Sequence, residues 1–199
     1  MPSAISARFH RERSWLASGT GRPSASCRAA ARQDSDGRPV PLAGQDRSRW
    51  DRALIAEGTA VLDAAMARRA PGPYQLQAAI IAVHVQAASF GDIDWPQIAA
   101  LYRELARWDP SPVIEINRAV AVGMADGPRA GLAVLEPILT SGALAGYAPL
   151  HAAHADLLDR AGETDAAAAA WTRAAAATSN DALREELHRR RGEATGEPS

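Results

Sequence analysis

The sequence predicts an all-helical protein, a right-handed superhelical stack of helical hairpins with flanking cap helices. Apolar residues make up 47% of the chain but aromatic residues only 5%, so small helix-favouring alanines must fill most of the interior. Apolar side chains recur at helical spacing from residue 50 onward. A pattern of small and large residues also occurs twice, 36 residues apart, as in proteins built from stacked hairpins.

The chain divides into three parts by composition and charge. Residues 1–45 are rich in Ser, Gly, Pro and Arg and lack sustained periodicity, which predicts a mostly disordered, basic segment. Residues 46–191 are predicted to form the helical-repeat domain, and residues 192–199 a disordered tail. Residues 1–50 carry nine arginines against four acidic residues, whereas residues 51–199 carry thirteen arginines against nineteen. The acidic repeat is therefore expected not to bind nucleic acid directly, because it repels phosphate.

Cysteine content and hydropathy indicate where the protein works. Cys27 is the only cysteine, which excludes a disulfide within one chain and fits a reducing compartment. No apolar run is long enough for a signal peptide or a membrane span. We therefore expect a cytoplasmic protein that does not bind membranes.

The front of the domain is marked by helix-start and turn signals. Ser48-x-x-Asp51 has the pattern of a helix start and predicts a helix over 48–69 that caps the stack. A Pro-Gly-Pro run then breaks the chain, and its last residue, Pro73, can begin the next helix, over 74–89.

The clearest repeat unit lies late in the chain, with a helix over 147–161, a turn at 162–164 and a second helix over 165–177. Small residues let the paired helices approach, while large ones fill spaces in the neighbouring hairpin, which is the spacing of a tetratricopeptide repeat. The matching positions are Ala155, Leu158, Gly162, Ala167, Trp171 and Ala174 in this copy, and Ala119, Val122, Asp126, Gly131, Leu135 and Ile138 in the copy upstream.

A third, fainter copy comprises the helix over 74–89 and another over 95–108, with Asp94 as N-cap of the second. Three hairpins reach the minimum that repeat stacking requires. A charged helix over 181–191 is expected to close the back of the stack.

The sequence contains no constellation that indicates catalysis. His151 and His154 share a helix face, but no third metal ligand accompanies them, so packing is the favoured interpretation. Asp92 and Asp94 precede a helix and are better explained as caps than as paired catalytic carboxylates. No glycine-rich phosphate loop occurs. We therefore predict a protein that is not an enzyme, with no catalytic, metal-binding or cofactor-binding residues and no cofactor.

Binding is predicted on the first helix of each hairpin, because these helices line the concave surface of stacked repeats. Asn117 and Arg118 can donate hydrogen bonds to peptide carbonyls or carboxylates. The groove candidates are Gln77, His84, Asn117, Arg118, His151 and His154. A second candidate, a docking surface, comprises Asp46, Arg47, Arg49, Trp50 and Asp51.

Two runs of sequence carry a family resemblance: DRSRWDRALIAEG at 46–58 and GPYQLQAAI at 72–80. They resemble the C-terminal extension of extracytoplasmic-function (ECF) RNA polymerase sigma factors, in the subgroup with tetratricopeptide-like repeats after the DNA-binding regions. Shorter matching stretches lie at 94–98, 111–113, 117–121 and 146–147, and the resemblance covers about residues 27–191.

The resemblance implies a role in regulating transcription initiation through protein-protein contacts. Candidate partners are the sigma DNA-binding domains and core RNA polymerase, and the docking surface would lie near the join to the former. In the family those domains precede the extension, but residues 1–45 contain no helix-turn-helix or promoter-melting pattern. Promoter binding is therefore carried over to no residue. Two alternatives stay open: a truncated or remnant sigma-factor fragment with no independent activity, and a small-ligand-sensing helical repeat.

Overall fold

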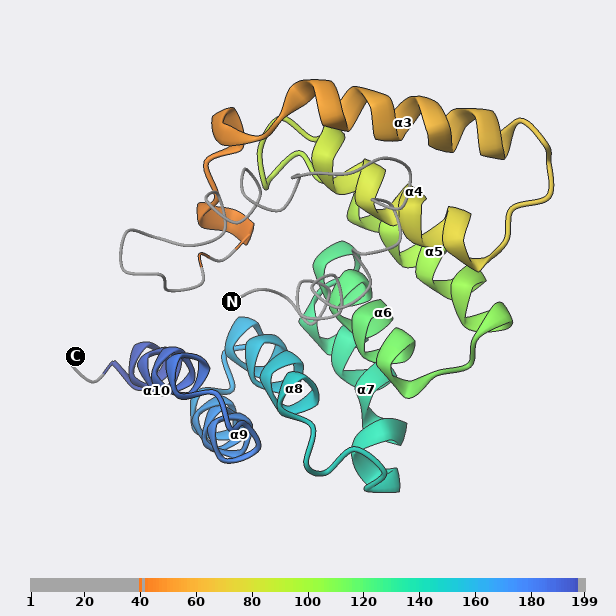
Figure 1. Ribbon diagram of the computed structural model, residues 1–199. Coiled ribbons are helices and arrows are strands. Elements are labelled where there is room, and N and C mark those ends of the chain that lie inside the picture. The colour runs from red at the N-terminus through yellow and green to blue at the C-terminus, as the bar shows by residue number, and fades with distance from the viewer. Residues whose placement is uncertain (1–39, 41, 197–199) are drawn as a thin grey trace. The chain divides into compact units, whose positions relative to one another are not determined.

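A computed structural model describes residue 40 and residues 42–196, and within them the protein is all helical, as predicted (Figure 1). The described residues form two compact units, which divide between Pro110 and Ser111. The predictions for residues 1–39, including Cys27, and for the last three residues lie outside the described part. In that part no helix is both long and apolar enough to cross a bilayer.

The first unit contains two short 3-10 helices, η1 (Leu42–Gly44) and η2 (Arg47–Arg49), followed by three α-helices. These are α3 (Arg52–Met66), α4 (Pro73–Gln86) and α5 (Trp95–Trp108). Helix α4 packs against both α3 and α5. The buried side chains of α4 and α5 that form this core include Leu76, Ile80, Ile98, Tyr102 and Leu105.

Helix α3 begins at Arg52 rather than at the predicted Ser48. The Asp51 carboxylate is the actual N-cap, because it accepts hydrogen bonds from the N–H groups of Ala53 and Leu54, both at 3.0 Å. Ser48 instead lies in η2, where its N–H and hydroxyl donate to Asp46. None of the α3 residues is buried, which fits a helix at the front of the stack.

The predicted start of α4 and the predicted span of α5 are confirmed. Pro73 is the first residue of α4. Asp94 caps α5, since its carboxylate accepts from the Gln97 N–H at 2.9 Å. Asp92 accepts from the N–H and hydroxyl of Ser89, at 3.0 and 2.7 Å, and closes the preceding turn. Both aspartates therefore stabilise local backbone structure.

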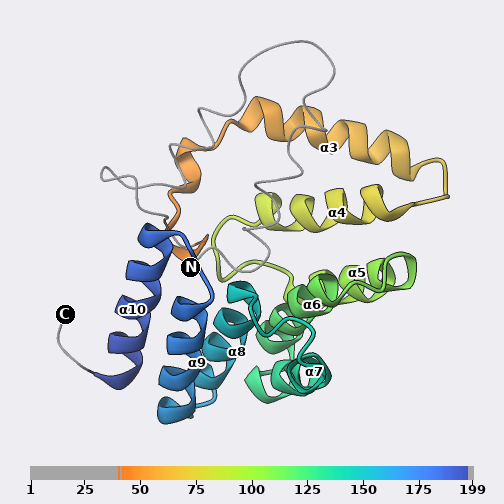
Figure 2. The same ribbon diagram turned by 60° about the horizontal axis from the view of Figure 1, so that its bottom comes forward.

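The second unit consists of two matched hairpins and a final helix. The first hairpin is α6 (Pro112–Ala125) and α7 (Pro128–Ser141), and the second is α8 (Ala148–Arg160) and α9 (Thr164–Ala176). Corresponding helices begin 36 residues apart, which confirms the predicted period. Helix α7 also packs on α8, and α10 (Asp181–Thr195) on α9 (Figure 2).

Small residues let the helices of each hairpin approach closely, as the repeat pattern predicts. The small residues Ala119 and Ala155 are buried, and so are the large residues Leu135 and Trp171 of the same pattern. A Cβ atom added to Gly131 would lie 2.6 Å from the Ala119 carbonyl oxygen, well inside van der Waals contact. The α6–α7 contact therefore requires glycine at this position.

The two hairpins differ in the residue that reverses the chain. Gly162, with φ +78°, does so in the second hairpin, as the alignment predicts. In the first, Asp126 keeps φ −115° and the left-handed conformation falls on Gly127, with φ +97°. An aspartate pays a steric penalty there that glycine avoids, which explains the one-residue offset.

The last helix is longer than predicted. Helix α10 continues past residue 191 to Thr195 and ends at Gly196, with φ +69°. Leu187 is buried, while Arg189 donates to Glu186 and Glu193 on the same helix. Such pairs support a helix end that composition alone makes look frayed.

Candidate functional site

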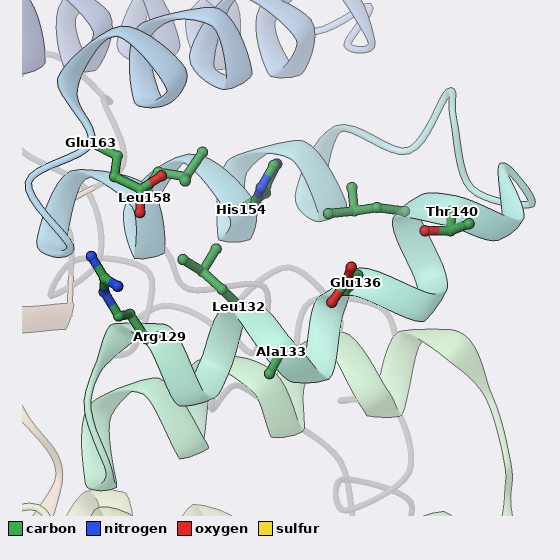
Figure 3. A pocket seen from close by; sticks show the side chains of 9 residues that line it. Arg129, Leu132, Ala133, Glu136, Thr140, His154, Leu158 and Glu163 are labelled. Atoms are coloured by element: carbon green, nitrogen blue, oxygen red, sulfur yellow. The ribbon is translucent and has the colours of Figure 1, made fainter.

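A groove of about 390 Å³ lies in the second unit, between α7 and α8 (Figure 3). Helix α7 supplies most of the lining and α8 the opposite wall, with one residue from the turn before α9. The lining residues are Arg129, Leu132, Ala133, Glu136, Leu139, Thr140, His154, Leu158 and Glu163.

Apart from His154, which lies in the middle, the polar side chains of the groove lie toward its ends and the apolar side chains between them. Figure 3 shows Arg129 and Glu163 at one end, and Glu136 with Thr140 at the other. These four side chains are exposed. The leucines are half-buried or buried. The groove therefore offers solvent-accessible charges around an apolar floor.

The groove is richer in hydrogen-bond acceptors than in cationic donors. Glu136 and Glu163 each bring a carboxylate, against the single guanidinium of Arg129. Pro137, inside α7, has no N–H to donate to the carbonyl of Ala133, which belongs to the lining. This turn of α7 therefore lacks one of its regular backbone hydrogen bonds.

His154 is neutral near pH 7. Burial lowers the pKa of its imidazole, the charges of Arg173 and His151 lower it further, and the nearby Glu163 carboxylate only partly opposes them. Its Nδ1 atom is buried and has no hydrogen-bond partner. A neutral imidazole keeps one N–H and one lone pair, so it can serve a ligand as donor or acceptor without adding positive charge.

Among the predicted groove candidates, His154 lines the groove and the others do not. His84, Asn117 and His151 are buried, at 7, 3 and 8% exposure. A ring nitrogen of His151 lies 2.6 Å from the Ala145 carbonyl oxygen. Their placement on an open surface is therefore corrected: the first helices pack against neighbours on more than one side, which buries residues that the repeat spacing places on the concave face.

The remaining two candidates are more accessible. Arg118 is half-buried and donates from Nε and Nη2 to Glu115 on the same helix, at 2.9 and 2.6 Å. Gln77 is half-buried on α4. Within the described residues no group of three or more His, Cys, Asp or Glu side chains could hold a metal ion.

The predicted docking surface is largely a folded connector. The Arg47 guanidinium, 9% exposed, donates from Nη1 to the carbonyls of His84 and Ala87 at the end of α4, both at 2.8 Å. It also lies 4.6 Å from the centre of the Trp50 ring, within cation–π range. Arg47 is therefore not available to a partner, which corrects its assignment to a docking surface.

The other members of this cluster differ in exposure. Asp46 is exposed and caps η2, and hydrogen bonds from Ser48 lower the pKa of its carboxyl. Asp51 caps α3. Arg49 is exposed, and for this residue docking stays a prediction.

His84 lies beside this connector. Its ring meets Trp95 edge to face, with centroids 5.3 Å apart, and neither ring nitrogen has a hydrogen-bond partner. Burial and the nearby charge of Arg47 lower the pKa of His84 to about 4. The imidazole is therefore neutral at neutral pH and acts as a packed core residue.

Sequence reasoning missed the residues that α7 contributes to the groove. One signal was available. Glu136 has no oppositely charged residue three or four positions away, whereas Glu115 pairs with Arg118 and Asp156 with Arg160 within their helices. A helix charge without such a partner is free to face a ligand.

Comparisons with known proteins give one family match over the front of the chain and one relative over most of it. A family of unknown function, DUF6596, matches residues 24–66, a stretch that ends with the last residue of α3. A protein of Rhizobium meliloti (strain 1021), described as uncharacterized, is 45% identical over 153 residues, which cover 77% of this chain and 36% of that protein. The chain thus spans about a third of the length of this relative. No solved structure matches the chain.

Proposed function

We propose that this chain is the C-terminal helical-repeat region of an ECF-type RNA polymerase sigma factor, and that it regulates transcription initiation in the cytoplasm through protein-protein contacts. The family assignment rests on the resemblance of residues 46–58 and 72–80 to that region. The greater length of the Rhizobium relative is compatible with further domains in proteins of this kind.

The observation that carries the binding role is the open groove on a stack of repeated hairpins. Its exposed charged ends and apolar floor match the polar rim and apolar centre of protein interfaces. The helices around it are held by buried small residues and do not need to rearrange for the groove to form. A rigid concave surface lowers the ordering cost that a partner must offset.

The direct test uses purified components. The full chain is immobilised and exposed separately to core RNA polymerase and to the paired DNA-binding domains of an ECF sigma factor from the same organism. Saturable binding of either one is expected, unchanged by nuclease treatment. Failure of both to bind would contradict the proposal.

A small-ligand sensor is the second candidate, favoured by the size of the groove. A volume of about 390 Å³ falls within the range of small-molecule sites, roughly 300–1,000 Å³. Thermal-shift screening against a metabolite library separates the candidates. The sensor function would be favoured by a ligand that raises the midpoint temperature of thermal unfolding by several degrees, if the chain binds neither protein partner.

A further inference from the structure

The groove between α7 and α8 has a charge pattern that selects among possible polypeptides. Of its ionisable side chains at neutral pH, two are negative and one positive, because His154 is neutral. Leu139 and Thr140, beside Glu136, also belong to the last turn of α7, where the helix dipole places partial negative charge, whereas the partial positive charge lies at the Arg129 end. The excess of carboxylates favours a cationic ligand, and the dipole favours it most at the Glu136 end.

The lining residues also suit a ligand that carries two kinds of side chain. Leu132, Leu139 and Leu158 give the groove its apolar floor, and the exposed Glu136 and Glu163 lie toward opposite ends of it. In an extended polypeptide alternate side chains point in opposite directions, so apolar and basic side chains can meet these two kinds of surface separately.

We propose that this groove binds an extended polypeptide segment in which apolar side chains alternate with arginine or lysine. The apolar side chains lie on Leu132, Leu139 and Leu158, and the basic ones reach Glu136 at one end and Glu163 at the other. This inference rests on the proposed function and defines the chemistry of the partner segment.

The test measures fluorescence anisotropy of a labelled ten-residue peptide of alternating leucine and arginine, titrated with the full chain. Saturable binding is expected that weakens with salt, and a peptide of alternating leucine and glutamate should bind at least tenfold more weakly. The double variant Glu136→Gln with Glu163→Gln should lose about twofold to thirtyfold in affinity, the loss expected when two accessible ion pairs are removed.

A second variant blocks the groove without removing negative charge from it. Ala133 is exposed in the middle of α7, so Ala133→Arg keeps a helix-favouring residue and fills the groove with a cation. It should reduce binding more than tenfold. Ala169→Arg, at an exposed position of α9, is the matched control and should bind at least half as tightly as wild type.

The matched control for the glutamates is Glu57→Gln with Glu185→Gln, two exposed positions outside the groove. Unchanged binding of the peptide by the groove variants would overturn the proposal. An equal loss of affinity in the control variants would overturn it too, because attraction of the peptide to the acidic chain as a whole would then explain the binding. If core polymerase or the sigma domains bind but the arginine peptide does not, the groove proposal fails and the proposed function stands. If none of them binds, both fail.

Discussion

A methyl group at Gly131 would collide with the backbone of α6. Its carbon would lie 2.6 Å from the Ala119 carbonyl oxygen and 2.9 Å from the Gly123 Cα atom. Backbone atoms cannot turn aside as a side chain does, so Gly131→Ala must push α6 and α7 apart. We expect the free energy of unfolding to fall by about 1–3 kcal/mol, the usual cost of overpacking.

Gly58 in α3 provides the matched control. No atom lies within 4 Å of a Cβ added there, so Gly58→Ala gains the helix propensity of alanine, up to about 1 kcal/mol, without a clash. Urea unfolding should therefore show opposite signs for the two glycine-to-alanine variants. Equal effects would contradict the close approach of α6 and α7.

His84 predicts a loss of stability in mild acid. Burial lowers the pKa of His84 to about 4 in the folded chain, against about 6.5 when unfolded. The unfolded chain therefore binds the proton first as pH falls, so stability is unaffected above about pH 6.5 and is lost between there and pH 4. The shift corresponds to at most about 3 kcal/mol.

The measurement is urea unfolding at pH 7 and pH 4.5 for wild type and for His84→Phe, which keeps an aromatic ring against Trp95. The lowered pKa of His154 acts in the same direction and remains in both proteins. The variant should lose less stability than wild type on acidification. An identical loss would show that His84 does not titrate as its environment indicates.

At the scale of the element, the Arg47 side chain fixes the 3-10 helix η2 to the end of α4. The two hydrogen bonds that Arg47 donates to the last carbonyls of α4 satisfy groups that the helix itself leaves unpaired. Arg47→Met keeps the apolar contact but removes both donors. It should lower the free energy of unfolding by about 1–3 kcal/mol.

Arg49→Met is the control for this change, because Arg49 is exposed in the same 3-10 helix. Hydrogen exchange in the last turn of α4 should quicken in the Arg47 variant alone. If the two variants exchange and unfold alike, Arg47 does not hold the end of α4.

The helices could be predicted where the sequence repeats and less well where it does not. Paired helices approach closely only at small residues, so small residues must recur at matching positions such as Ala119 and Ala155. This recurrence is why helices α6 to α9 could be predicted. The faint copy in α4 and α5 is explained by its connection: residues 87–94 separate these helices, whereas only residues 126–127 separate α6 from α7.

The groove was harder to predict than the helices. Repeat spacing predicts which residues pack within and between hairpins, whereas the open space of the groove depends on how the connection after Ser141 sets α7 against α8. The prediction of the binding residues also assumed that a side chain on the concave face of a first helix is exposed. His84 and Asn117 lie at such positions, but neighbouring helices cover them.

At the scale of the whole molecule, charge is divided along the chain. Residues 1–50 are basic and residues 51–199 acidic, so electrostatic attraction of the repeat domain is toward cationic surfaces of other polypeptides rather than toward nucleic acid. We therefore propose that the repeat binds a polypeptide and does so at the groove of the second unit.

Hydrogen-exchange mass spectrometry of the full chain, alone and saturated with the sigma DNA-binding domains or with core polymerase, tests this claim most directly. The predicted result is slower exchange across residues 128–163, which contain α7, α8 and the groove, with the Ala133→Arg variant showing no such protection. Exchange that stays unchanged throughout residues 128–163 in the presence of both partners would contradict it.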